Sequence, residues 1–440
     1  MKRWNKNKEG KTLSEGIGKK VGRREFMGTG AAAAGFMIMA PHLVRGSAAN
    51  SSLRVGLLGC GGRGEADATY MIETGKARLV ALGDLFQDQL DKAKAHFDKF
   101  QKAKGIAPIE KSLMFRGPNA YKEIANSKDV DVIIITTPPY FHPQHLAEVV
   151  TAGKHVYCEK PVAVDPQGCI SVLDSGRRAQ GRLSLEVGFQ LRNAPPYVEQ
   201  VKRIHAGALG DIVSGTGHYY SSYIKRPTWP GASEDERRLR NWVHYRILSG
   251  DIIVEQNIHV IDVCNWVLQG HPIKAAASGS NKYRPDHGDA YTNYSVVYEY
   301  PNGVSMTFGS TQCNKGWWDV GWKFFGTKGV SETHYNGPVA IYGENAWKYG
   351  EGASKSGGGA FSAAGVFHGN LDQADPDKKM SFVNSILNNQ FHNQVEQGVE
   401  SALSCMMARQ AAYTGEEVGY DALASSGEHW EDEIDLNQFA

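Results

Sequence analysis

A short glycine loop between two strand-like runs constrains the fold of this chain more than any other feature. An apolar run, 53–58, leads into the loop Gly59-Cys60-Gly61-Gly62-Arg63-Gly64, and a helical pattern then leads into a second apolar run, 78–83. The loop fits G-x-G-x-x-G, whose glycines allow a tight turn, the approach of a pyrophosphate, and close packing of helix on strand. This order is typical of a dinucleotide-binding unit, so the six loop residues are candidate cofactor-binding residues.

An acid at the end of the second run bears on the choice of cofactor. Asp84 lies 25 positions after Gly59, near the spacing at which a carboxylate holds a ribose hydroxyl. Because this carboxylate would repel a 2′-phosphate, we expect NAD(H) rather than NADP(H), with NADP(H) still possible through Arg63. A glycine-rich turn without a ligand is the alternative, since 50 of the 440 residues are glycine. The flanking strands and the acid favour a dinucleotide.

Strands and helices alternate over residues 50–181. The run Val130–Thr137 is mostly β-branched, and His155–Cys158 forms a second short strand. Such repeated β-α-β units predict a doubly wound parallel sheet, a Rossmann domain, whose ligands lie at the carboxyl ends of the strands. Residues at those ends are predicted to contact the cofactor, and they are Thr137, Pro138, His142, Glu159 and Lys160.

A second domain, 182–440, is predicted to contain an open, largely antiparallel sheet, which makes the fold class α/β followed by α+β. Tyr300-Pro301-Asn302-Gly303 indicates a hairpin between two of its strands. The predicted strands are 212–220, 273–280, 291–300, 304–311 and 322–325. The other expected elements are a helix over 252–268, a long glycine- and serine-rich loop over 343–378, and C-terminal helices over 379–413.

The first 49 residues have the order of an export signal rather than of a folded domain. A lysine-rich segment precedes Arg23-Arg24, a mildly apolar run covers 28–44, and small residues suited to cleavage occupy 47–49. The paired arginines resemble a twin-arginine signal, so we expect a periplasmic or other extracytoplasmic protein. The apolar run is too short and mild for stable membrane insertion to be expected, and an uncleaved anchor is the alternative.

Composition argues against several other functions. Lysine and arginine number 48 and aspartate and glutamate 47, so the formal net charge is +1, and no basic stripe stands out. Nucleic-acid binding is therefore not implied. The six cysteines are scattered and include no C-x-x-C pair, which argues against a zinc site and against a disulfide framework.

Four stretches carry a family resemblance: Gly59–Gly64, Thr137–His142, Glu159–Pro161 and Glu255–His259. Together they resemble the Gfo/Idh/MocA (glucose-fructose oxidoreductase, inositol dehydrogenase and MocA) family. The resemblance implies a nicotinamide cofactor in the first domain and a carbohydrate or cyclitol substrate on the second domain's sheet. It also implies a homo-oligomer, a dimer or tetramer, through that open sheet. Many members carry Asp four residues before the site histidine and Gly two before it, where this chain has Glu255 and Asn257, which suggests a subgroup with its own substrate.

Oxidation of a carbinol requires a group that exchanges the hydroxyl proton while hydride leaves to the nicotinamide. Lys160 is the first candidate, with a surface lysine after a strand as the alternative. Glu255 and His259 are four apart on the predicted helix and would converge on one site, with a solvated ion pair as the alternative. These three are the predicted catalytic residues. No third ligand accompanies the last two, so no metal is predicted.

Polar and aromatic residues near the junction of the predicted domains suit the hydroxyls and apolar face of a sugar. The substrate-binding candidates are Gln190, Arg192, Trp242, Tyr245, Asn257 and His259, with Trp229, Arg240 and Asn241 beside them. We favour an NAD(P)-dependent oxidoreductase that acts on a secondary hydroxyl with a tightly bound, recycled cofactor. A glycoside hydrolase that oxidises its sugar transiently through bound NAD is the first alternative. A non-catalytic sugar-binding module is the second.

Overall fold

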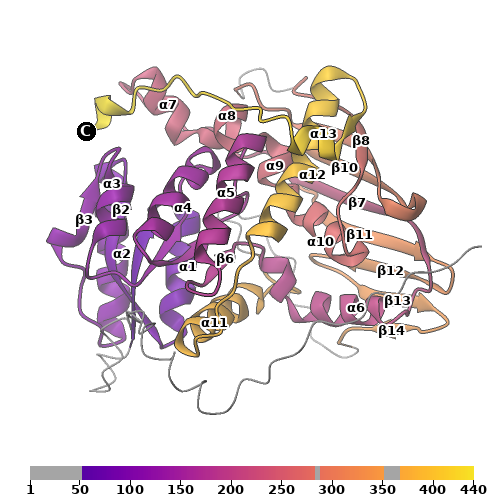
Figure 1. Cartoon of the computed structure of the whole chain (residues 1–440), viewed down its shortest axis with the longest axis horizontal. Coiled ribbons are helices and arrows are strands. Elements are labelled where there is room, and N and C mark those ends of the chain that lie inside the picture. Colours follow the sequence, from indigo (N-terminus) through magenta and orange to yellow (C-terminus); the bar gives the residue numbers. More distant parts are fainter. Residues whose placement is uncertain (1–51, 283–287, 351–366) are drawn as a thin grey trace, which may run out of the picture. The chain divides into compact units, whose positions relative to one another are not determined.

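The glycine loop lies at the centre of a parallel six-stranded sheet in the computed structural model, which describes residues 52–282, 288–350 and 367–440 (Figure 1). The predicted export signal, 1–49, lies outside the described residues. The strand order β3-β2-β1-β4-β5-β6 reverses between β1 and β4, and open α/β sheets bind ligands at such a point. The strands are β1 Leu53–Leu58, β2 Ala77–Asp84, β3 Met114–Arg116, β4 Val132–Ile135, β5 His155–Cys158 and β6 Leu185–Val187.

Helices cover both faces of this sheet. Along β4, Val132 and Ile134 pack into one hydrophobic cluster, whereas Ile133 and Ile135 pack into another. The predicted doubly wound parallel sheet is therefore confirmed. It extends beyond residue 181, because β6 pairs in parallel with β5 as its sixth strand. The helices of this part are α1 Gly62–Glu73, α2 Gln87–Ala103, α3 Ala120–Asn126, α4 His142–Thr151 and α5 Pro166–Ala179, with short 3-10 turns η1 Lys111–Leu113 and η2 Pro139–Phe141.

The second sheet has nine strands in the order β14-β13-β12-β11-β7-β10-β9-β8-β15. β7 and β10 pair in parallel at its centre, and the other neighbours pair antiparallel, so the predicted sheet type is confirmed. Buried and partly exposed residues alternate along β7 from Gly215, because only one face packs on helices. We call the other side, which carries His218 and Tyr220, the open face.

The strands of this sheet are β7 Ile212–Ser222, β8 Lys274–Ser280, β9 Asn293–Glu299, β10 Ser305–Asn314, β11 Asp319–Gly326, β12 Gly329–His334, β13 Val339–Gly343, β14 Trp347–Lys348 and β15 Val418–Gly419. The helices are α6 Pro195–His205, α7 Glu234–Arg240, α8 Arg246–Ser249, α9 Ile252–Glu255, α10 Ile258–Leu268, α11 Ala374–Leu387, α12 Val395–Thr414 and α13 Tyr420–Ala424. The 3-10 turns are η3 Gln190–Asn193, η4 Trp242–His244, η5 Pro301–Gly303 and η6 Leu436–Phe439. None of the described helices is both long and apolar enough to span a membrane.

Two local predictions have different outcomes. The hairpin is confirmed, since β9 and β10 pair antiparallel and Asn302 and Gly303 take the positive φ values, 64° and 74°, that the turn requires. The predicted loop over 343–378 is only partly a loop. β14 lies within it and α11 begins at Ala374, while 351–366 lie outside the described residues. The predicted C-terminal helical run is interrupted between α11 and α12.

The predicted helix over 252–268 is wrong in one respect that matters for the site, because it is broken in two. α9 ends at Glu255, and α10 begins three residues later. In an unbroken helix the Glu255 carbonyl would accept from the amide of His259. It accepts instead from Nζ of Lys160 at 2.6 Å. Glu255 and His259 therefore belong to two helices rather than to one helical face.

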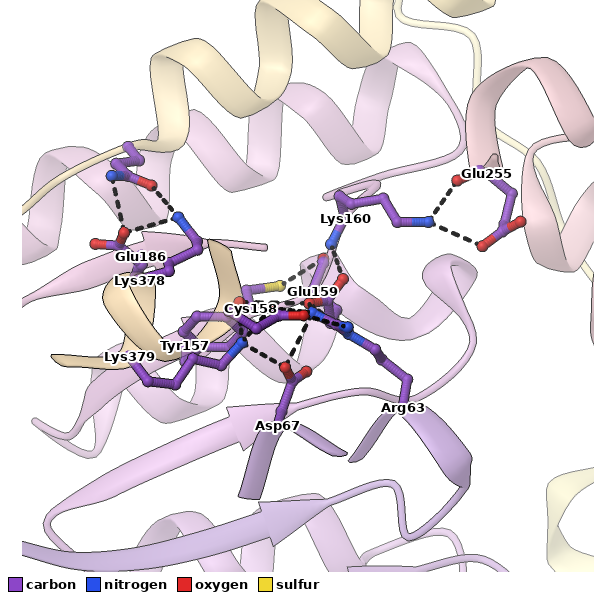
Figure 2. A network of polar contacts seen from close by, with 12 residues as sticks. Arg63, Asp67, Tyr157, Cys158, Glu159, Lys160, Glu186, Glu255, Lys378 and Lys379 are labelled. Carbon is purple, nitrogen blue, oxygen red and sulfur yellow. Dashed lines mark hydrogen bonds and ion pairs between the residues drawn. The ribbon is translucent and has the colours of Figure 1, made fainter. Parts of the chain in front are cut away.

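A cluster of five charged side chains, four of them buried and one, Arg63, partly buried, ties the glycine loop to α11 (Figure 2). Arg63 donates two hydrogen bonds to Asp375, at 2.9 and 3.2 Å, and one to Glu159 at 3.1 Å. Lys379 donates to Asp375 at 3.0 Å, and both cations lie at ion-pair distance from Asp67. We call these five residues the ion cluster. Its members come from α1, the end of β5 and α11, so the cluster fixes these three elements together.

The ion cluster holds two cations and three carboxylates, so it carries an excess negative charge when all five groups are ionised. Burial raises the pKa of Glu159 and Asp375, but the adjacent cations outweigh burial and lower both pKa values below the ordinary range. Asp67 is fully buried, and its ion-pair contacts lack hydrogen-bond geometry within the described structure. Burial, only partly offset by Arg63 and Lys379, raises its pKa to about 7. A proton on Asp67 therefore balances the cluster.

We predict different outcomes for Asp67→Asn and Asp375→Asn, a matched pair of isosteric changes. Asp67→Asn mimics the protonated carboxyl, so the free energy of unfolding at pH 8 should stay the same or rise. Asp375→Asn removes the carboxylate that both cations share, so it should lower that free energy by about 3–5 kcal/mol, the scale for breaking a buried ion pair. Urea unfolding at pH 8 measures both, and equal destabilisation would contradict this account.

The pH dependence of stability supplies the control. The pKa of Asp67 is higher in the folded state than in the unfolded chain, so its contribution to stability is fully present below the unfolded pKa of about 4. That contribution is lost as the pH rises through about 7. Unfolding of the wild type and of Asp67→Asn across pH 5 to pH 8 should therefore show this loss only in the wild type.

Candidate active site

Each glycine of the loop has a distinct steric role. Gly59 has a φ of 94°, and a Cβ there would lie 2.6 Å from the backbone of Thr136. A Cβ at Gly64 would lie 2.2 Å from the carbonyl oxygen of Gly59, so that glycine allows α1 to pack closely on β1. A Cβ at Gly61 would meet nothing within 4 Å, and Gly61 lines a cavity. The loop thus has a tight turn, a close helix contact and an open position for a phosphate.

Asp84 supports the same loop from the end of β2. Its carboxylate accepts hydrogen bonds from the backbone amides of Cys60 at 2.7 Å and Phe86 at 2.9 Å, and it also lines the cavity. Cys60 is 1% exposed, its side chain packs in the hydrophobic core, and it does not line the cavity, unlike Gly59, Gly61 and Gly62. No side chain caps the N-terminus of α1, so this helix end can face an anion. These features fit a dinucleotide.

The cavity beyond the loop measures about 390 Å³. A C-terminal segment, 428–440, which we call the C-terminal strap, contributes to its wall through Leu436. The Phe439 ring packs edge-on against Phe86 with centroids 5.5 Å apart, and its carbonyl accepts from Arg116 at 3.3 Å. Figure 1 shows the strap in yellow, running from α13 back past α8 and α7. Among the predicted cofactor-binding residues, this first cavity is lined by Gly59, Gly61, Gly62, Asp84, Thr137 and Pro138.

A second cavity of about 280 Å³ adjoins the first. The two share Thr136, Thr137, Arg240 and Trp242 in their walls. The second cavity is lined by all three predicted catalytic residues, Lys160, Glu255 and His259, and by Arg63, His142, Glu159 and Gln190. The structure therefore joins a cofactor-sized cleft to a smaller polar cavity that contains the candidate proton-transfer groups.

Lys160 and Glu255 form a fixed pair in this second cavity (Figure 2). Nζ of Lys160 donates to the Glu255 carbonyl at 2.6 Å and to Oε1 at 3.0 Å. His259 is 6% exposed, and its Nδ1 makes no hydrogen bond within the described structure. Burial lowers the pKa of His259 well below its usual range, and the positive charges of Lys160 and Arg63 lower it further. The imidazole is therefore neutral and offers one nitrogen that can accept a proton.

Four predicted cofactor-binding residues line the second cavity rather than the first, and they are Arg63, His142, Glu159 and Lys160. Arg63 and Glu159 are committed to the ion cluster, so Arg63 is not free to hold a 2′-phosphate. The ring nitrogens of His142 lie 2.7 Å from the carbonyl oxygens of Pro161 and Thr137. His142 thus braces the two strand ends that border the cavity.

The predicted substrate-binding residues divide into two groups. Gln190 and Trp242 line the second cavity with His259, whereas Arg192, Tyr245 and Asn257 do not. Arg192, Tyr245 and Asn257 were predicted to contact the substrate, and the structure instead places them outside this cavity.

Each of the three has a reason for lying elsewhere. Arg192 forms a bidentate ion pair with the fully buried Asp262, at 2.9 and 3.0 Å. The Tyr245 hydroxyl accepts from Arg226 at 2.6 Å, and its ring packs against a separate hydrophobic cluster. Asn257 is 0% exposed at the start of α10.

Sequence reasoning missed several residues around these cavities. Tyr219 and Lys225 line the second cavity, and Asp375 and Lys379 complete the ion cluster beneath it. Tyr219 lies in a predicted strand, but alternation alone does not say which face meets the substrate. Asp375 lies in the segment 343–378 that was predicted to be a loop, so the sequence indicated no ion-pair partner for its carboxylate.

Models of known protein families match both parts of the chain. Residues 53–187 match the oxidoreductase family with an NAD-binding Rossmann fold, and residues 197–332 match the GFO/IDH/MocA C-terminal domain. Inositol 2-dehydrogenase of Rhizobium meliloti is 25% identical over 66% of this chain and 78% of its own length. Inositol 2-dehydrogenase/D-chiro-inositol 3-dehydrogenase of Lactiplantibacillus plantarum is 29% identical, over 34% of this chain and only 37% of its own length.

Solved structures share the fold at lower identity. Aldose-aldose oxidoreductase from Caulobacter crescentus aligns with a TM-score of 0.65 at 17% identity, over 84% of this chain and 99% of its own. A levoglucosan dehydrogenase in complex with NADH and levoglucosan aligns with a TM-score of 0.65 at 19% identity, over the same shares of the two chains. With both domain models matched in order, this chain belongs to the Gfo/Idh/MocA family of NAD-binding oxidoreductases.

Proposed function

We propose that this protein oxidises a secondary hydroxyl of a sugar, sugar derivative or cyclitol with NAD(H). The observation that carries the proposal is the neutral His259, buried beside the Lys160–Glu255 pair in a cavity that adjoins the cofactor cleft. A bound nicotinamide supplies the hydride acceptor. The second cavity supplies a proton acceptor and a donor that orients the hydroxyl. The relatives named inositol 2-dehydrogenase support this class of substrate.

The three residues have separate proposed roles. His259 is the proposed acceptor of the hydroxyl proton, because it lines the second cavity and a neutral imidazole has one nitrogen that can accept. Lys160 holds the substrate oxygen with its third N–H, since the other two donate to Glu255. Glu255 positions Lys160. Glu255 has one methylene more than the aspartate that the resemblance implies. Its Oε1 nevertheless lies 3.0 Å from Nζ of Lys160, so the contact between lysine and carboxylate is kept.

Lys160→Ala should lower turnover by about 10²–10⁴-fold, the usual scale for a positioned acid–base group, and leave folding and cofactor binding intact. Turnover is measured with the best substrate from a panel of inositols and aldoses. Lys225→Ala is the matched control, because Lys225 lines the same cavity but is assigned no catalytic role; it should affect KM more than kcat. Near-normal turnover in Lys160→Ala would reject the assignment.

We propose NAD(H) over NADP(H) as the bound cofactor. Asp84 lines the first cavity with a carboxylate that would repel a 2′-phosphate, and Arg63 is held in the ion cluster. Arg240 also lines this cavity, but it pairs with Asp88 at 2.8 Å and Glu236 at 2.7 Å. Direct titration of cofactor-free protein tests the preference, and tighter binding of NADP(H) would overturn it.

We further propose that the cofactor stays bound and is restored in place. The C-terminal strap supports this proposal, because its Leu436 lines the first cavity and hydrogen bonds anchor the strap to the rest of the protein. The Tyr140 hydroxyl donates to the Trp430 carbonyl at 3.1 Å, and the Asp435 amide donates to Asp235 at 3.2 Å. Either a second substrate takes the hydride, or the oxidised intermediate takes it back. The second route corresponds to a glycoside hydrolase that uses bound NAD transiently, and a redox-neutral product would identify it.

Protein purified without added cofactor should carry about one nicotinamide per chain. The double variant Leu436→Ala with Phe439→Ala should lose it at least about tenfold faster on dilution, because Leu436 lines the cavity and Phe439 packs on Phe86, which also lines it. Released nicotinamide is quantified by mass spectrometry. Ile170→Ala, at an exposed apolar position of α5, is the control and should retain the wild-type rate. An unchanged loss rate in the double variant would refute the role of the strap.

We propose export by the twin-arginine route, from the sequence of the first 49 residues, which lie outside the described structure. This route carries folded proteins, so a cofactor loaded in the cytoplasm would travel with the chain. Replacement of Arg23 and Arg24 by lysine should trap active, cofactor-loaded protein in the cytoplasm, as measured by cell fractionation. Export of the variant at the wild-type level would contradict the proposal.

We also propose a homo-oligomer formed through the open face. Large apolar side chains exposed there support it, since Val297 is 51% exposed and Tyr342 49%. Sedimentation equilibrium tests it, and a monomer at micromolar concentration would overturn it.

A further inference from the structure

Three side chains on neighbouring strands meet on the open face. His218 lies on β7, Asp319 on β11 and His334 on β12, and we call them the open-face triad. Within the described part of the chain, they form the one group of three or more histidine, cysteine or carboxylate side chains whose ligand atoms all lie within 4.8 Å of one another. The strand register explains the meeting, because Gly321 of β11 pairs with His218 on one side and with His334 on the other.

The distances within the triad suit a metal ion. Nε2 of His218 lies 2.8 Å from Oδ2 of Asp319, and Nδ1 of His334 lies 2.8 Å from Oδ1. Ligand atoms about 2.0–2.2 Å from a zinc-type ion are separated from one another by about 3–3.5 Å. Small side-chain rotations would therefore place two imidazole nitrogens and one carboxylate oxygen around a single ion. Two histidines with one carboxylate are a ligand set of divalent transition metals.

Gly321 leaves room for this arrangement. A Cβ at this position would lie 3.1 Å from Nδ1 of His334 and 3.3 Å from Cε1 of His218. Any side chain there would press on both imidazoles and point out over the triad. The ligands also lie on paired strands rather than on loops, which holds their backbones in fixed register.

Surrounding groups resemble the outer shell of a metal site. Nε2 of His334 lies 3.4 Å from Oε1 of Glu332, so His334 can bind an ion through Nδ1 while it donates its other N–H to a carboxylate. Glu332 is itself held by Lys323 at 2.7 Å and by the Tyr342 hydroxyl at 3.0 Å. The His218 ring stacks on Tyr220 with centroids 4.9 Å apart. Both histidine rings are therefore supported from outside the triad.

We propose that the open-face triad binds one divalent transition-metal ion of the zinc type, in a site separate from the active site. Tyr219, the neighbour of His218 along β7, is buried on the opposite side of the sheet and lines the second cavity. The triad and the substrate cavity are thus on opposite faces. The ion would have three protein ligands and at least one further position for water. Its role is structural, in fixing β7, β11 and β12 together.

The test is metal binding by the full chain after removal of metals with a chelator. Titration with Co²⁺, followed by its visible absorption, and with Zn²⁺, followed by calorimetry, should give one ion per chain. His218→Ala and His334→Ala should each weaken binding by about 100-fold or more. His368→Ala is the matched control, because His368 pairs with Asp372 on the surface and is 70% exposed; it should leave binding unchanged.

A second measurement avoids the risk that a variant fails to fold. Diethyl pyrocarbonate modifies accessible imidazoles, and mass spectrometry locates the modified residues. Zn²⁺ should protect His218 and His334 in the wild-type protein but leave His368 reactive. The proposal is overturned if the wild type binds no ion, if both triad variants bind as the wild type does, or if protection is equal at all three histidines.

Discussion

The ion cluster around Arg63 is the constraint on which the rest of the site depends. Four buried charged groups and the partly buried Arg63 can stay away from water only if they neutralise one another closely, since removing ions from water costs several kcal/mol per ion. Arg63 belongs to the glycine loop, Glu159 directly precedes Lys160, and Asp375 lies 312 residues from Arg63 in sequence. The cluster therefore holds the glycine loop, the strand end that precedes Lys160, and the helix α11 in one arrangement.

A second contact connects this arrangement to the other sheet. Nζ of Lys160 donates a hydrogen bond to the Glu255 carbonyl, which in a continuous helix would accept from the amide of His259. At this point α9 ends and α10 begins three residues later. The break places Glu255 against Lys160 and leaves His259 at the start of α10, in the wall of the same cavity. The proposed proton-transfer groups thus come from two parts of the chain and meet where Lys160 replaces a helical hydrogen bond.

Local patterns predicted much of the fold. β5 was predicted to the residue, as His155–Cys158, because a short apolar strand between a helix and Glu159 has clear limits. The loop glycines were identifiable because their spacing is a local pattern, although the backbone that a Cβ at Gly59 would meet, at Thr136, is distant in sequence. The predicted catalytic trio also lines one cavity, because the family resemblance identified strand ends and a helix that the topology brings together.

The features that the sequence could not predict depend on contacts between residues that are far apart in the chain. Arg192 looks like a substrate ligand until Asp262 is placed beside it. The strap and the open-face triad likewise depend on contacts between residues far apart in the chain, for which a single sequence contains no periodic signal. The break at Glu255 was not predictable, because the donor that replaces the helical hydrogen bond there, Lys160, lies 95 residues away.

The central claim is that a cofactor held in the first cavity takes hydride from a sugar or cyclitol carbon in the second. The most direct test is isotope transfer. Protein with its bound cofactor is mixed with carbon-deuterated inositols and aldoses, quenched rapidly, and the released nicotinamide is analysed by mass spectrometry. The account predicts deuterium on the nicotinamide ring in up to one equivalent per chain. Conversion of the sugar while the bound nicotinamide stays free of deuterium would contradict it.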